Sequence, residues 1–135
     1  MDRPPSDFDL LREIYERHSE DYRAHATEGP MTAVPIDIPA IASKFGVEPN
    51  SVWGRLYHHL DREYGEPKDP SGGPRKALFI PGEDQNFVNF PLLEAVLAGL
   101  WQERNRNLWA IGIALASLVF SLASIIVTVV VAVTA

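Results

Sequence analysis

The sequence contains no cysteine, and it has only three lysines against nine arginines. Without cysteine the chain forms neither disulfides nor metal–thiolate sites, and it has no thiol nucleophile. This absence agrees with a reducing compartment. The scarcity of lysine relative to arginine is typical of a GC-rich bacterial genome.

The sequence is also poor in positively charged residues. Twelve Lys and Arg residues face eighteen Asp and Glu residues, which gives a formal net charge of −6. The deficit is uneven: residues 1–37 carry −5, residues 38–80 carry +1 and residues 81–108 carry −2. Neutralising phosphates supplies most non-specific affinity for DNA. No segment is therefore basic enough to act as a nucleic-acid-binding tail.

The motifs of common enzyme classes are missing as well. Gly72-Gly73 lacks the flanking strand and helix that a P-loop or a dinucleotide-binding loop needs. His58 and His59 are adjacent, and adjacent residues of a helix point about 100° apart, so the pair cannot chelate one ion. The other two histidines are seven residues apart with no third ligand nearby. We predict no catalytic residues, no metal site, no cofactor and no small-molecule substrate.

A long uncharged run occupies residues 109–135. It contains no charged residue, His, Asn, Gln or Pro, and 14 of its residues are Leu, Ile, Val or Phe. As a helix it would be roughly 40 Å long, whereas the hydrocarbon core of a bilayer is about 30 Å thick. A lone strand would leave its backbone groups unpaired in lipid, which favours a helix despite many β-branched residues. The run predicts a C-terminal transmembrane helix.

The residues before this run predict its interface and its orientation. Trp101 and Trp109 are typical of the headgroup level, and Arg104 and Arg106 precede the span while no charge follows it. The positive-inside rule then places the N-terminal residues in the cytoplasm of a single-pass inner-membrane protein. The lipid bilayer is the first expected partner.

About 100 residues precede the span, enough for one small domain with a modest core. We expect residues 1–7 to be flexible and residues 8–25 to form a helix capped by Asp7. Residues 33–38 follow as a short strand. Pro35 confines that strand to the edge or end of a sheet, because proline has no N–H to donate.

The clearest pattern in the soluble part follows this strand. A short helix over residues 39–45 ends at Gly46, which suits left-handed C-cap geometry, and a longer helix capped by Asn50 or Ser51 comes next. The alanine in the first helix, the Gly-Val turn and the Val-x3-Leu-x3-Leu spacing resemble a helix-turn-helix. The expected core consists of Ile41, Phe45, Val47, Val52, Leu56, Leu60, Leu78 and Ile80.

Two short strands are predicted over residues 75–81 and 86–90. The order helix, strand, helix, helix, strand, strand over residues 8–90 resembles the winged helix-turn-helix superfamily. The predicted fold class is therefore α+β, with a small winged helix-turn-helix domain at 8–90. A juxtamembrane helix at 91–108 carries an apolar stripe and continues into the transmembrane helix at 109–135.

In DNA-binding members of that superfamily the second helix of the motif enters the major groove. The resemblance implies a DNA or partner face of Ser51, Arg55, His58 and Arg62, which share one side of an α-helix, and phosphate contacts from Lys44, Lys68, Arg75 and Lys76. The acidic balance favours a docking module with a cytoplasmic protein partner instead. A membrane-tethered DNA-binding transcriptional regulator is the alternative, and a small membrane effector of a phage or defence system is the second alternative.

Small and weakly polar residues repeat along the span at intervals of four and three. A seven-residue repeat places them on one helix face, and small residues let helix backbones approach closely in lipid. The pattern predicts a parallel homodimer held by close packing and hydroxyl contacts. This seam consists of Ala110, Ala114, Ser117, Ser121, Ser124 and Thr128.

Overall fold

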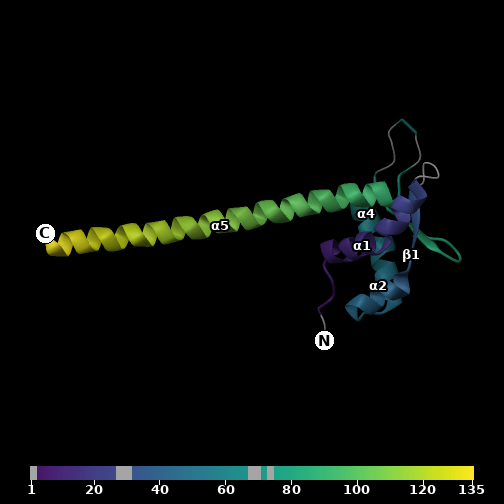
Figure 1. Cartoon of the computed structure of the whole chain (residues 1–135), viewed down its shortest axis with the longest axis horizontal. Helices are drawn as coiled ribbons and strands as arrows, with labels where there is room; N and C mark the ends of the chain where they lie inside the picture. Colours follow the sequence, from purple (N-terminus) through teal and green to yellow (C-terminus); the bar gives the residue numbers. More distant parts are fainter. Residues whose placement is uncertain (1–2, 27–31, 67–70, 73–74) are drawn as a thin grey trace. The chain divides into compact units, whose positions relative to one another are not determined.

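A computed structural model describes residues 3–26, 32–66, 71–72 and 75–135 of the chain (Figure 1). Helices predominate, beside a small three-stranded sheet and a long apolar C-terminal helix, in agreement with the predicted α+β class. The chain divides into two compact units, Met1–Gly99 and Leu100–Ala135. Helix α5 (Phe90–Thr134) contributes residues to both units.

Helix α1 (Asp7–Ala26) begins with a capping box. Ser6 Oγ accepts a hydrogen bond from the Asp9 N–H at 3.1 Å, and the Ser6 N–H donates to Asp9 Oδ2 at 3.3 Å. These bonds satisfy backbone donors that the start of a helix leaves open. Ser6 is therefore the N-cap, and the expectation that Asp7 caps the helix is wrong by one residue. The Asp7 carboxylate is used elsewhere. The fully buried side chains of α1 are Leu10, Leu11 and Ile14.

Three antiparallel strands form one sheet in the order β1-β3-β2. Val34 on one side and Phe79 on the other both lie opposite Val88 of the central strand. Pro35 is exposed on an outer strand, so its predicted place at a sheet edge is confirmed. The strands are β1 (Ala33–Ile36), β2 (Phe79–Ile80) and β3 (Asn86–Asn89).

Helix α2 (Ile38–Phe45) has a cap at each end. At its start Asp37 Oδ1 accepts a backbone N–H bond at 3.0 Å. At its end Gly46 has φ 65° and ψ 32°, a left-handed conformation that side-chain-bearing residues rarely adopt. The Val47 N–H then donates to a carbonyl of the last turn at 3.0 Å, which completes a Schellman motif. The predicted C-cap at Gly46 is confirmed.

The second helix of the motif consists of three consecutive segments. Pro49 starts it without a side-chain cap from the preceding residue, so Asn50 and Ser51 lie inside the helix rather than at its cap. Its middle segment is a π-helix. The segments are α3 (Pro49–Arg55), η1 (Leu56–Leu60) and α4 (Asp61–Tyr64).

Five of the eight predicted core residues are buried. Phe45 and Val47 are half-buried, whereas Ile80 is 39% exposed. The buried side chain of β2 is its neighbour Phe79, because successive residues of a strand point to opposite faces. The correctly predicted buried residues are Ile41, Val52, Leu56, Leu60 and Leu78.

The start of α5 closes the core of the Met1–Gly99 unit. Phe90 is fully buried, and its ring centroid lies 5.4 Å from that of Tyr15 and 4.5 Å from that of Tyr22. Asn89 Oδ1 accepts the Leu92 N–H at 3.3 Å and caps the helix. From there α5 continues for 45 residues, which confirms the predicted continuous helix from the soluble part into the apolar run.

Candidate functional site

The predicted DNA or partner face lies on the helix that contains η1. In η1 the Asp61 N–H donates to the Leu56 carbonyl, five residues back rather than four. A π turn takes about one extra residue, which rotates the later residues of the helix by roughly 100° relative to a regular α-helix. Leu56 and Leu60 are both fully buried, so the core holds this turn in place.

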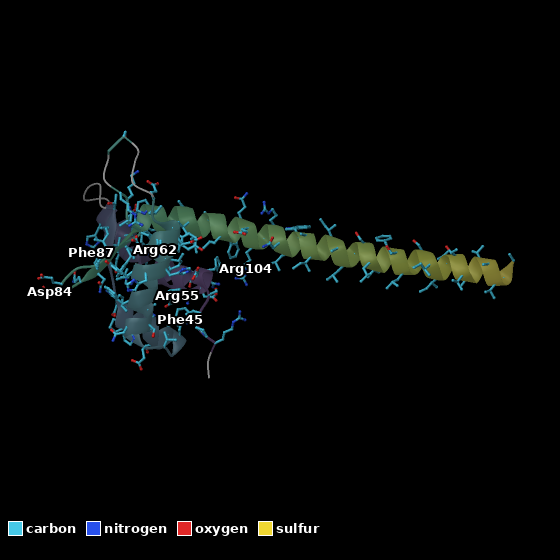
Figure 2. All side chains as sticks on the ribbon, turned by 180° about the vertical axis from the view of Figure 1, so that it is seen from behind. Phe45, Arg55, Arg62, Asp84, Phe87 and Arg104 are labelled. Atoms are coloured by element: carbon cyan, nitrogen blue, oxygen red, sulfur yellow. The ribbon has the colours of Figure 1, made fainter. Side chains whose placement is uncertain are left out.

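Arg55 does not share its surroundings with the other three residues of the predicted face, because it bonds to Pro5 and Asp7. Ser51, His58 and Arg62 are exposed to solvent, and His58 and Arg62 line one groove. Arg55 is half-buried and turned towards the N-terminal segment (Figure 2). The four-three-four spacing describes one face only for an uninterrupted α-helix, and this helix is interrupted.

Arg55 is held by the residues that precede and start α1. Its Nη2 lies 2.6 Å from Asp7 Oδ1, and its Nη1 donates to the Pro5 carbonyl. His59 Nε2 lies 3.0 Å from Asp7 Oδ2, and the Tyr64 hydroxyl donates to the same oxygen at 3.5 Å. Partial burial raises the pKa of Asp7, but hydrogen bonds and charge from Arg55 and His59 outweigh it, and the net effect is a lowered pKa.

An open groove of about 740 Å³ lies between this helix and the start of the hairpin. The Trp53 and Tyr57 rings stack with centroids 4.9 Å apart, and the His58 ring stands edge-on to Tyr57 at 4.9 Å. Aromatic rings with polar neighbours are typical of protein-recognition surfaces. The groove is lined by Tyr57, His58, Asp61, Arg62, Glu63, Gly65, Arg75, Ala77 and Phe79.

Asp61, which lines this groove, bonds to three other residues of the domain. Its Oδ1 accepts the backbone N–H groups of Leu78 at 2.8 Å and Phe79 at 3.2 Å. Its Oδ2 accepts from Arg75 Nη1 at 2.8 Å. One carboxylate thus ties the helix to the hairpin. Leu78 follows Asp61 by 17 residues, so no local sequence pattern predicts this contact.

The predicted phosphate contacts differ in what surrounds them. Lys44 is exposed on α2, whereas Arg75 is paired with Asp61 and Lys76 Nζ lies 3.5 Å from a Glu66 carboxylate oxygen. The fourth, Lys68, lies outside the described residues. Two of the three described cations therefore already have anionic partners.

The loop between β2 and β3 is acidic. Glu83 and Asp84 are both exposed, and Figure 2 shows Asp84 at the tip of the hairpin, directed away from the body of the domain. This loop corresponds in position to the wing of the predicted fold. Its charge repels a phosphate backbone.

Comparison with known proteins shows no matching family model, no similar curated protein and no similar solved structure. The residues themselves are therefore the basis for a functional proposal. Among the residues that the structure describes, no group of three or more His, Cys, Asp or Glu side chains is placed to hold a metal ion.

The Leu100–Ala135 unit consists of the rest of α5. This helix is long and apolar enough to cross a membrane, and none of its most apolar window is buried. Trp101, Arg104, Arg106 and Trp109, the predicted interface residues, are all exposed on it.

The seam residues are exposed too, but the hydroxyl groups of Ser121, Ser124 and Thr128 donate to carbonyls of their own helix. Ser121 Oγ donates to the Ser117 carbonyl at 2.9 Å, and Thr128 Oγ1 donates to the Ser124 carbonyl at 2.8 Å. Ser124 Oγ does the same to the carbonyl of Phe120 at 2.9 Å. These bonds leave no unpaired hydroxyl hydrogen at those three positions to face lipid.

Proposed function

We propose that the chain is a single-pass inner-membrane protein, anchored through residues 109–135, that presents a cytoplasmic winged-helix docking module to a protein partner. The observation that carries the proposal is the exposed apolar surface of α5, on which every side chain from Trp101 onward is accessible. Exposed apolar area costs about 25 cal/mol per Å² in water, and a bilayer removes that cost. The span of 27 residues is long enough for this role.

Two features of the fold support the winged-helix part of the proposal. The elements follow the order helix, strand, helix, helix, strand, strand. In the sheet the first strand pairs with the last, and the second strand pairs on the far side of it. In a winged helix, the same arrangement sets a two-stranded wing beside the second helix of the motif.

The charges of the domain favour a protein partner over DNA. Arg55 is occupied by Asp7, and Arg75 is occupied by Asp61. The wing loop is acidic where a DNA-binding wing needs cations. A membrane-tethered DNA-binding regulator remains the second candidate, because His58 and Arg62 are exposed on the predicted reading helix.

The docking function is tested by site-specific photocrosslinking in cells that naturally make the protein. A photoreactive amino acid at Arg62, in the groove, should give one discrete protein adduct. The same group at Arg12, exposed on α1, serves as the matched control. Equal adducts from both positions, or none from Arg62, would contradict a docking face. Adducts to DNA instead of protein would favour the regulator.

The membrane position has its own test. We expect the full chain to stay in the membrane fraction after carbonate extraction, because residues 109–135 carry no charge. Protease added outside intact spheroplasts should leave the N-terminal domain uncut. Release by carbonate would refute the anchor, and digestion from outside would refute the orientation.

We further propose that the anchor forms a parallel dimer along the seam. Since the hydroxyls of Ser121, Ser124 and Thr128 donate within their own helix, close packing of small residues supplies the contact. Replacing Ser117 and Ser121 by Leu should lower the dimer yield in detergent crosslinking. Replacing Leu118 and Leu122 by Ile, on other faces, is the control. Equal yields from both pairs would show that the seam is not an interface.

A further inference from the structure

Three side chains of the second motif helix converge on one carboxylate. Arg55, His59 and Tyr64 all direct a donor at Asp7, at 2.6 Å, 3.0 Å and 3.5 Å. Arg55 also binds the carbonyl of Pro5 through its other terminal nitrogen. The Arg55 guanidinium bonds two acceptors, and a second side chain donates to the other oxygen of the carboxylate. This arrangement binds an anion strongly.

We propose that Arg55, His59 and Tyr64 form a binding site for a carboxylate of an acidic protein segment, and that Asp7 fills this site in the unbound protein. The inference rests on the docking function proposed above and names the chemistry of the partner. Asp7 acts as an internal competitor. The partner supplies a carboxylate in its place, so the donors of the site stay satisfied in both states.

The surroundings of the site permit this exchange. The side chains of Arg55 and Asp7 are 27% and 26% exposed, and His59 is 53% exposed, so a second carboxylate reaches the donors from solvent. Leu10 and Leu11 are fully buried and hold α1 in place. A rotation of the Asp7 side chain therefore opens the site without unfolding the helix that carries it.

Charge distribution favours an acidic peptide over a nucleic acid. The site itself is built for a planar anion with two oxygens, which is the shape of a carboxylate. A duplex long enough to span the domain would also meet Glu83 and Asp84 on the wing loop. A short acidic segment needs to reach only the donors of Arg55, His59 and Tyr64.

The test uses the full chain in nanodiscs of neutral lipid and a fluorescein-labelled hexaglutamate peptide as the probe. Fluorescence anisotropy should show that Asp7→Asn binds the peptide about tenfold more tightly than the unmodified chain, because the internal competitor is removed. Adding Arg55→Gln to Asp7→Asn should abolish the gain. If Asp7→Asn disturbs the far-UV circular dichroism spectrum, Asp7→Ser carries the same test.

Glu20→Gln is the matched control, because it removes one negative charge from the exposed side of the same helix. Equal gains from Glu20→Gln and Asp7→Asn would overturn the proposal in favour of general electrostatics. No gain from Asp7→Asn, or a gain that survives Arg55→Gln, would also overturn it. A gain for a 20-base-pair duplex but not for the peptide would assign the site to phosphate. In each of these cases, a protein adduct in the photocrosslinking experiment at Arg62 would still support the docking function.

Discussion

Replacing Asp61 by Ala should destabilise the Met1–Gly99 unit by about 3 to 5 kcal/mol, since it leaves two backbone donors without their charged acceptor. The side chain is only 14% exposed, and it accepts the N–H groups of Leu78 and Phe79. The third bond, from Arg75, adds less because that arginine is 39% exposed and solvent screens the pair. Small domains have free energies of unfolding of about 5 to 15 kcal/mol, so the loss is a large share of the total.

Urea-dependent pulse proteolysis of the full chain in detergent micelles measures this free energy for the Met1–Gly99 unit. Asp61→Asn keeps one carbonyl oxygen for the hairpin and should cost about 1 to 2 kcal/mol. Asp84→Ala removes the same side chain from the exposed wing tip and should change stability by less than about 0.5 kcal/mol. If Asp61→Ala is as mild as Asp84→Ala, the carboxylate does not hold the hairpin to the helix.

Other substitutions test burial, titration and close approach. Phe90→Ala should lower the free energy of unfolding by about 3 to 5 kcal/mol, because Phe90 is fully buried. Phe45→Ala should cost clearly less, because Phe45 is only half-buried. Equal costs would contradict the burial of Phe90. Burial lowers the pKa of His18 below its ordinary value of 6.5, so the melting temperature should fall as pH drops below about 6.5, and His18→Gln should flatten this dependence. A side chain at Gly65 would collide with the Asp61 carbonyl, so Gly65→Ala should cost about 1 to 3 kcal/mol in the same proteolysis assay.

The features predicted well from the sequence are those with a local physical cause. Gly46 is the residue able to take the left-handed cap, and Pro35 cannot sit in a central strand. No proline separates the apolar stripe after Pro91 from the uncharged run, so one long helix was expected and α5 is one. The spacing of Leu56 and Leu60 placed both in the core.

The features that were missed depend on contacts between residues far apart in the sequence, or on sequence patterns that fit two different structures. Asp7 and Arg55 are 48 residues apart, and no periodicity connects them. Leucines four residues apart fit an α-helix and a π turn equally well, so η1 was not foreseen. The run around Phe79 and Ile80 is apolar throughout, and without alternation it does not indicate which side chain faces inward.

The sheet edge formed by β1 restricts how any partner can bind. Extended peptides often join a sheet as an extra strand, through the free backbone groups of its outer strand. Here Pro35 has no N–H, and the N–H of Asp37, just beyond the strand, donates to His18 Nε2 at 3.3 Å. The opposite outer strand, β2, is two residues long. Strand addition therefore has few backbone donors available at either edge of the sheet. The same shortage protects neighbouring copies of the domain from edge-to-edge aggregation.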